Sequence, residues 1–112
     1  PLEAIEFYLP LLDKVTIMIV DPGISGQKVD PQMFVKIKKL AKIRKERNLN
    51  FLIEADGSMN KELYAPLYKA GADMVILGPP ALWNKDEDFS KAWEIMENEV
   101  ETELQGVERD AI

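Results

Sequence analysis

The 112-residue sequence contains no histidine and no cysteine. Without cysteine there is no disulfide framework, iron–sulfur cluster or thiolate zinc site, and without histidine there is no imidazole for acid–base or metal chemistry. Any chemistry must come from carboxylates, hydroxyls, amines or the backbone. Long apolar runs are also missing, because the longest, Val15 to Val20, is far below the roughly 20 residues that span a bilayer. We therefore expect a soluble, cytoplasmic protein with no membrane partner.

Charge is unevenly distributed along the chain. The formal net charge is −6, and residues 86–112 hold ten acidic side chains against two basic ones. We interpret this segment as a solvated helix followed by an acidic tail over residues 106–112. Residues 36–47 are strongly basic, which leaves nucleic-acid binding open, but no aromatic side chain alternates with them. Proteins that bind the phosphate backbone of nucleic acids are usually basic, whereas this chain is acidic overall, so we expect no nucleic-acid partner.

The apolar pattern predicts strands that alternate with helices. Three short segments, rich in β-branched and apolar residues, have the pattern of buried parallel strands: residues 15–20, 51–55 and 74–77. Cap residues and helical periodicity predict helices between and after them, over residues 31–47, 60–70 and 89–104. This order predicts an α/β fold of βαβ units, but three strands alone would leave two apolar edges unpaired. The pattern is better explained as three units of a larger structure.

Glycines follow the end of each predicted strand. They are Gly23 and Gly26 after the first strand, Gly57 after the second and Gly78 after the third. Ligands of parallel α/β folds bind at the carboxyl ends of the strands, where glycine lets the backbone approach a phosphate. A single such glycine is a weak signal and is more typical of an ordinary turn. The series of three strand ends indicates a phosphate site.

Two carboxylates lie at the end of the second predicted strand. Asp56, next to Gly57, could bind a metal ion or move a proton, but a turn or cap role fits its position equally well. Glu54 lies two residues earlier and therefore on the same strand face. The sequence leaves open whether the two form a paired carboxylate site or whether Glu54 belongs to an ion pair inside a barrel.

Three segments resemble the ribulose-phosphate 3-epimerase family, whose members are TIM barrels. Residues 17–27, Ile-Met-Ile-Val-Asp-Pro-Gly-Ile-Ser-Gly-Gln, resemble the strand-six signature, and residues 54–60 and 72–78 resemble strands seven and eight. The form Asp-Gly-Ser-x-Asn, together with residues 82–84, is most similar to the D-allulose-6-phosphate 3-epimerase subgroup. The resemblance implies that residues 1–105 are the C-terminal portion of a TIM (β/α)8 barrel, strands six to eight only.

The resemblance also implies a function and a set of site residues. Family members invert C3 of a phosphorylated ketose, such as allulose 6-phosphate or ribulose 5-phosphate, by proton abstraction and reprotonation. A divalent metal ion (Zn, Fe, Mn or Co) stabilises the enediolate. Asp56 matches the aspartate that is both metal ligand and acid/base. The residues that match the substrate- and phosphate-binding positions are Met18, Gly23, Ile24, Ser25, Gly26, Gly57, Ser58, Gly78 and Pro79. We also expect a homo-oligomer.

The sequence departs from the family pattern in two respects. The other metal ligands of the family, two histidines and a second aspartate, lie on earlier strands, so we expect this chain alone to bind no metal and to be inactive. Pro79 and Pro80 replace a Ser/Thr-Ser pair, and proline has no N–H to donate to phosphate. Two alternatives remain: another phosphate-binding barrel enzyme, such as a decarboxylase, and a non-catalytic partial barrel that self-associates.

Overall fold

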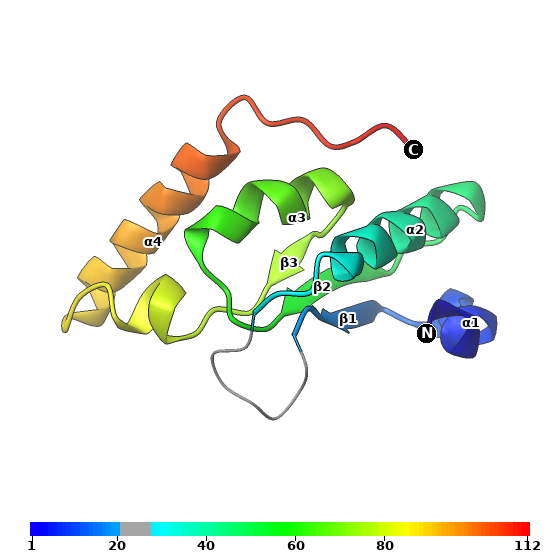
Figure 1. The fold of residues 1–112 in the computed structure, drawn as a ribbon, viewed down its shortest axis with the longest axis horizontal. Coiled ribbons are helices and arrows are strands. Elements are labelled where there is room, and N and C mark those ends of the chain that lie inside the picture. Colours follow the sequence, from blue (N-terminus) through cyan, green and yellow to red (C-terminus); the bar gives the residue numbers. More distant parts are fainter. Residues whose placement is uncertain (21–27) are drawn as a thin grey trace.

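The structure, a computed structural model, describes residues 1–20 and 28–112. Its elements are, in chain order, α1 (Leu2–Ile5), the 3₁₀ helix η1 (Glu6–Leu11), β1 (Lys14–Met18), α2 (Gln32–Glu46), β2 (Leu52–Asp56), the 3₁₀ turn η2 (Lys61–Leu63), α3 (Tyr64–Ala70), β3 (Met74–Val75), the π-helical turn η3 (Pro79–Trp83) and α4 (Phe89–Leu104). The strands form one parallel sheet in the order β1-β2-β3. The sheet lies between α1 and α4, which occupy opposite ends of the molecule (Figure 1). The predicted α/β pattern of three parallel strands is confirmed, and it is consistent with part of a TIM barrel.

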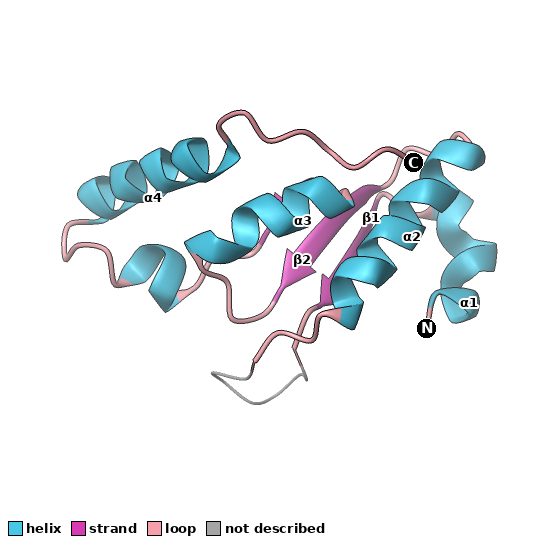
Figure 2. Ribbon diagram, turned by 45° about the horizontal axis from the view of Figure 1, so that its top comes forward, coloured by secondary structure: helices cyan, strands magenta, loops and turns pink. Residues whose placement is uncertain are grey.

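One face of the sheet is covered by helices. Along β1 and β2 the side chains alternate between the two faces, and Val15, Ile17, Ile53 and Ala55 point into the core. Figure 2 shows α2 and α3 packed over this face. The largest fully buried side chains come from η1, α2, β2, α3 and the residues next to β1 and β2: Leu9, Ile19, Ile37, Leu40, Phe51, Ile53 and Leu67. The apolar stripe predicted for α2 therefore does face the core.

Side-chain hydrogen bonds at Asp30 and Asn60 lie before α2 and before η2, which leads into α3. The Asp30 carboxylate accepts a hydrogen bond from the Gln32 N–H at 2.9 Å, directly before α2. The Asn60 side chain accepts one from the Glu62 N–H at 3.0 Å, directly before η2. Pro66 is tolerated because it lies in the first turn of α3, where its missing N–H has no helical partner to lose. Both caps are the ones that the sequence predicts.

Gly71 ends α3 and lets it lie close to α2. Its φ of +124° is one that residues with a Cβ rarely adopt, and a Cβ there would lie 2.7 Å from the Ala41 Cβ. The Gly71 N–H donates to the Leu67 and Tyr68 carbonyls at 3.1 Å, which closes the last turn. The predicted helix stop at this glycine is confirmed, and it also sets the spacing between α2 and α3.

Two predicted elements differ from the structure. The third strand is limited to β3, although the Ile76 N–H still donates to the Ala55 carbonyl at 3.0 Å. The apolar face predicted for the last helix is only partly buried: Met96 is buried, whereas Phe89 and Trp93 are exposed. Periodicity shows which residues share a helix face, but burial also requires a neighbouring element. Among the described residues, the elements that pack against α4 are η3, α3 and η2, and they leave the Phe89 and Trp93 side chains partly open to solvent.

Within residues 1–20 and 28–112, no helix covers the opposite face of the sheet. Met18, Leu52, Met74 and Ile76 are all more than a third exposed. In a closed barrel this face would be the interior, which is filled by layers of side chains. Across the described part of the chain, no helix combines the length and the apolarity that crossing a bilayer requires.

The residues after α4 return to α2 and α3. The Asp110 N–H donates to the Lys69 carbonyl at 2.8 Å, and the Asp110 carboxylate lies 3.5 Å from the Lys38 Nζ. The Lys45 Nζ donates to the Ile112 carbonyl at 2.8 Å. Residues 106–112 thus follow the helical layer rather than extending from it. Their separation as a tail from residues 1–105 stays a prediction.

Candidate functional site at the carboxyl ends of the strands

The sheet brings Met18 and Asp56 together. They are register partners at the carboxyl ends of β1 and β2, and the Ile19 N–H donates to the Asp56 carbonyl at 2.9 Å. Because parallel partners point to the same face, both side chains lie on the open face of the sheet. Met18 is exposed and Asp56 is half-buried. Two residues singled out from separate segments therefore share one edge of the sheet.

The turn after β2 requires glycine. Gly57 has a φ of +125°, and a Cβ on it would lie 2.6 Å from the Val20 Cγ2 atom. Ser58 follows with a φ of +46°. Two successive residues in the left-handed region reverse the chain sharply at the end of the strand. This turn keeps the backbone of Gly57 close to Val20, just after the end of β1.

The turn after β3 is built differently. Gly78 has an ordinary negative φ of −125°, and a Cβ on it would meet nothing within 4 Å. Pro79 and Pro80 open η3 and contribute no N–H. The N–H groups of Leu82 and Trp83 donate to the Gly78 carbonyl at 3.0 and 3.4 Å. The amide donors of this turn are therefore largely missing or already used, as the two prolines suggest.

Glu54 is held by an ion pair. Its side chain is buried, at 4% exposure, on the otherwise open face of the sheet. It accepts a hydrogen bond from the Thr16 hydroxyl at 2.8 Å, and the Lys14 Nζ lies 3.3 Å from its Oε1 atom. Of the two possibilities left open by the sequence, the structure shows the interior ion pair. Lys14 and Thr16 were not singled out as site residues, although their two-residue spacing on β1 matches that of Glu54 and Asp56 on β2.

Asp56 has no such partner. Among the described residues its carboxylate makes no hydrogen bond and no ion pair. Nor do residues 1–20 and 28–112 contain any group of three or more acidic side chains that could hold a metal ion. Divalent cations in proteins take several oxygen or nitrogen ligands. The described residues therefore do not fit the implied metal by themselves, and a role of Asp56 in proton transfer stays a prediction.

The remaining predicted site residues fall on a segment without a description. Gly23, Ile24, Ser25 and Gly26 lie outside the described residues. Their assignment to the substrate-binding loop stays a prediction.

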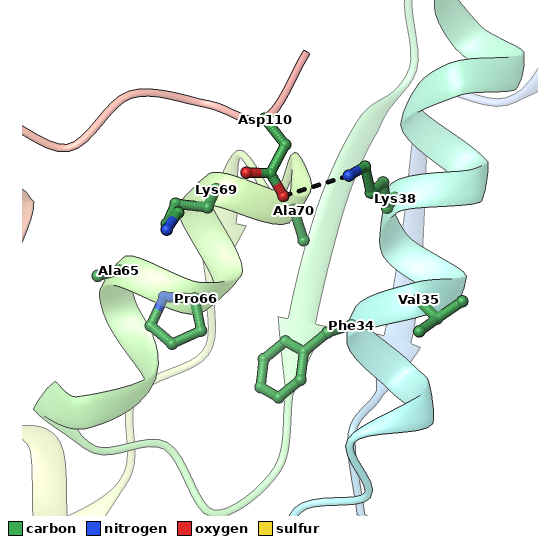
Figure 3. A pocket seen from close by; sticks show the side chains of 8 residues that line it. All are labelled: Phe34, Val35, Lys38, Ala65, Pro66, Lys69, Ala70 and Asp110. Atoms are coloured by element: carbon green, nitrogen blue, oxygen red, sulfur yellow. Dashed lines mark ion pairs between the residues drawn. The ribbon is translucent and has the colours of Figure 1, made fainter. Parts of the chain in front are cut away.

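A groove on the other side of the molecule is distinct from these strand ends. It has a volume of about 510 Å³ and runs between α2 and α3, on the helical surface of the molecule. In Figure 3, Phe34 and Val35 line one wall and Ala65 and Pro66 the other, and the ion pair of Lys38 and Asp110 lies across the upper end. No residue predicted for the phosphate or proton-transfer site lines it.

Tyr64 is a buried polar residue that sequence reasoning did not find. It begins α3, shortly after the carboxyl end of β2, and its hydroxyl has no hydrogen-bond partner among the described residues. Burial, with a smaller contribution from the negative charge of Glu99, raises the pKa of Tyr64 above its ordinary value. Glu99 itself is ion-paired with Lys85 at 3.1 Å. Helical periodicity alone predicts that Tyr64 is a core residue, but it does not indicate whether a described residue hydrogen-bonds to the hydroxyl.

The sequence is similar to a family of known proteins. The sequence profile of the Ribulose-phosphate 3 epimerase family matches residues 1–82. The chain is 41% identical over 87 residues to a ribulose-phosphate 3-epimerase of Methanocaldococcus jannaschii, which covers 78% of this chain and 37% of that protein. It is 38% identical over 85 residues to the one of Aquifex aeolicus, covering 76% of this chain and 38% of that protein. It is 36% identical over 86 residues to a chloroplastic ribulose-5-phosphate-3-epimerase of Arabidopsis thaliana, covering 77% of this chain and 31% of that protein.

The matched region contains β1, β2 and β3 and every predicted site residue. The chain spans between about a third and two fifths of the length of these relatives. A family match over most of the chain, together with three parallel strands that carry an aspartate and glycines at their carboxyl ends, leads to one conclusion: the chain belongs to the ribulose-phosphate 3-epimerase family.

Proposed function

We propose that this chain is the C-terminal portion, strands six to eight, of a sugar-phosphate 3-epimerase barrel. A complete barrel that contains it inverts C3 of a phosphorylated ketose in the cytoplasm. The observation that carries the proposal is the Asp56 carboxylate at the end of β2, beside Met18, which no described residue pairs, in a chain of this family. A neighbouring carboxylate, Glu54, is neutralised by Lys14.

In this proposal Asp56 removes or returns the proton at C3. As a carboxylate it accepts the proton from C3 of the bound ketose, and the enediolate that forms takes up a proton at the same carbon from the opposite face. The second acid/base group belongs to strands outside this chain. Met18 lies next to Asp56 and provides an apolar, polarisable contact for the planar intermediate, which excludes water from it.

The phosphate group of the substrate would bind at the turns after β2 and β3. The left-handed turn of Gly57 and Ser58 supports this assignment, since it keeps the backbone close to the strand end. Gly78 would contribute on the other side, but Pro79 offers no N–H, so we expect weaker phosphate binding than in a barrel with serine there. The Asp-Gly-Ser-x-Asn form of residues 56–60 favours allulose 6-phosphate as the substrate, with ribulose 5-phosphate as the alternative.

The divalent metal ion of the family would, when bound, stabilise negative charge on the substrate oxygens. Asp56 is the only ligand that we propose from this chain. The complete barrel, which we propose to form homo-oligomers, would supply the others.

The direct test is an exchange assay on two proteins. The isolated 112-residue chain, and a complete barrel in which it replaces the matching region of the Aquifex aeolicus relative, are incubated in D₂O with ribulose 5-phosphate or with allulose 6-phosphate. We expect deuterium at C3 with the complete barrel only, and faster incorporation with allulose 6-phosphate. Turnover by the isolated chain would contradict the partial-barrel proposal, and no exchange with either substrate in a folded complete barrel would contradict the activity.

A non-catalytic role has one observation in its favour, the exposed apolar side chains of Leu52, Met74 and Ile76 on the open sheet face. A partial barrel could cover this face by self-association. Sedimentation of the isolated chain over a range of concentrations tests this role, because a stable dimer at micromolar concentration would support it.

A further inference from the structure

The groove between α2 and α3 is a concave surface that the proposed epimerase site does not use. Its apolar lining residues come from both helices: Phe34, Val35, Ala65, Pro66 and Ala70. We call these residues, together with the charged lining residues Lys38, Lys69 and Asp110, the α2–α3 groove. Its volume of about 510 Å³ is in the range of small-molecule sites, roughly 300–1,000 Å³.

Flat rings lie on both walls of the α2–α3 groove. In Figure 3 the Phe34 ring points from α2 toward α3, and the Pro66 ring lies on the opposite wall. Val35, next to Phe34, is 47% exposed. An aromatic ligand placed between the two rings would bury a large apolar area against them. The groove therefore favours a ligand with a flat apolar body.

Lysine side chains make the α2–α3 groove positive in a chain whose formal net charge is −6. Lys38 and Lys69 outnumber Asp110 among its lining residues. An adjoining groove of about 330 Å³ is lined by Lys38 and by two further lysines, Lys39 and Lys42. A positive, partly apolar surface of this kind is complementary to an anion with an apolar body.

One carboxylate of the chain already lies at the end of the α2–α3 groove. The Asp110 carboxylate is 3.5 Å from the Lys38 Nζ (Figure 3). Both side chains are well exposed, so this ion pair contributes little. Lys69, on the other wall, has no acidic partner within residues 1–20 and 28–112. It is therefore the cation that a bound anion would contact.

The dimensions of the α2–α3 groove favour a small ligand over a peptide helix. With seven residues, α3 is only about 10 Å long. The segment after α4 crosses one end, where the Asp110 N–H donates to the Lys69 carbonyl at 2.8 Å. A helix that binds through anchors at i, i+3 or i+4 and i+7 needs about this length for its anchors alone. Its continuation would meet the segment after α4.

We propose that the α2–α3 groove binds a small organic anion with a flat aromatic body and one acidic group. The body lies between Phe34 and Pro66, and the acidic group pairs with Lys69. The site lies on the helical surface of the chain and uses none of the residues proposed for C3 epimerisation. It therefore does not depend on the proposed function.

The test compares two probes that share one ring system. The sulfonate probe is 8-anilinonaphthalene-1-sulfonate, and the uncharged probe, N-phenyl-1-naphthylamine, is the same molecule without the sulfonate. Both are titrated into the full 112-residue chain and followed by fluorescence. We expect the sulfonate probe to bind about fivefold more tightly, as one partly exposed ion pair allows. Equal affinities would overturn the proposal, because the groove would then act only as an apolar surface.

Methyl NMR spectra of the unmutated chain show where the sulfonate probe binds. The resonances of Val35, Ala65 and Ala70 should shift as the probe is added. Leu52 and Met74 are the internal controls, because they are exposed on the open face of the sheet, outside the groove. Groove shifts no larger than those of the open face would overturn the proposal.

Three variants test the role of charge. Lys69→Met should weaken binding of the sulfonate probe about fivefold and leave the uncharged probe unaffected. Asp110→Asn removes the carboxylate that competes for the lysines and should tighten sulfonate binding about threefold. Lys91→Met is the matched control, because it removes the same charge from an exposed position of α4, and it should change binding by less than about twofold. Equal effects of Lys69→Met and Lys91→Met would contradict the site.

A second copy of the chain is the alternative occupant of the α2–α3 groove. In that case the affinity for the sulfonate probe would fall as the protein concentration rises, and sedimentation would show a matching increase in mass. This result would overturn the proposal. A complete barrel without epimerase activity but with the probe site intact would contradict the proposed function alone.

Discussion

Two aspartates at opposite ends of the sheet show how differently its ends are built. Asp73 precedes β3 and accepts hydrogen bonds from the Ile53 N–H at 2.9 Å and from the Arg44 and Arg109 guanidinium groups at 2.7 and 3.3 Å. Asp56 ends β2 with a carboxylate that no described residue pairs. At the amino end of the sheet the Asp73 carboxylate is fully paired, whereas at the carboxyl end the Asp56 carboxylate has no partner among residues 1–20 and 28–112. The same division between stability and chemistry is typical of TIM barrels.

Asp73 also joins three parts of the chain. Arg44 belongs to α2 and donates to the Phe51 carbonyl at 2.9 Å, before β2. Arg109 follows α4, donates to the Ala72 carbonyl at 3.1 Å and lies over the Tyr68 ring at 4.4 Å. One carboxylate therefore connects the sheet, the helical layer and the C-terminal segment. Removal of the Asp73 carboxylate should therefore lower the free energy of unfolding, whereas removal of the Asp56 carboxylate should not.

The largest expected effect is on catalysis. In a complete barrel that contains this chain, Asp56→Asn should lower C3 proton exchange by about 10³-fold, within the range of positioned acid–base groups. The free energy of unfolding of the isolated chain should change by less than about 0.5 kcal/mol. Asp13→Asn, an exposed aspartate before β1, is the control and should leave both quantities unchanged. Undiminished exchange in Asp56→Asn would contradict the proton-transfer role proposed for Asp56.

The second effect is on stability. Asp73→Ala should lower the free energy of unfolding by about 2–3 kcal/mol, because it leaves the Ile53 N–H and two guanidinium groups without their acceptor. Urea unfolding of the isolated chain measures it. The matched control is Asp110→Ala, whose more exposed carboxylate lies 3.5 Å from the Lys38 Nζ and should contribute less than about 0.5 kcal/mol. Equal losses in the two variants would refute the role of Asp73.

The third prediction separates the two glycine turns at the carboxyl end. Gly57→Ala should cost about 1–3 kcal/mol, because its φ of +125° is unfavourable for alanine and the new Cβ would meet Val20. Gly78→Ala should be neutral or should stabilise the chain by up to about 1 kcal/mol, because its φ is negative and the space is open. Thermal unfolding distinguishes them, and a larger loss at Gly78 would be the opposite of what the structure implies.

The smallest effect concerns Tyr64. At neutral pH, Tyr64→Phe should leave the stability unchanged or raise it by up to about 1 kcal/mol, because the buried hydroxyl has no partner to lose. The pKa of Tyr64 is higher in the folded state than in the unfolded chain, so the folded state holds this proton more tightly. The free energy of unfolding is therefore unaffected by Tyr64 titration below about pH 10, and it falls as the pH rises through the folded-state pKa. Urea midpoints between pH 8 and pH 11 should fall less in Tyr64→Phe than in the unmutated chain. A steeper fall in the variant would contradict this pKa direction.

Much of the fold follows from local signals in the sequence. The caps at Asp30 and Asn60, the stop at Gly71 and the apolar strands all act over a few residues, so they could be recognised without the structure. Asp56 and Gly57 were found for the same reason, since a carboxylate and a glycine directly after a strand are a local pattern. The exposure of Phe89 and Trp93 could not be predicted, because it depends on which elements pack beside α4.

What the sequence by itself determined is the order of strands and helices, the lack of thiol and imidazole chemistry and the identity of the strand-end residues. What only the tertiary structure decided is which charges are paired. Lys14 and Thr16 are 40 and 38 residues from Glu54, and Arg109 is 36 residues from Asp73. Pairing across such separations is set by strand register and helix packing, which no local pattern encodes. For this reason the sequence could name Glu54 and Asp56 together, while the parallel register placed Glu54 beside Lys14 and Thr16 and gave Asp56 no partner among the described residues.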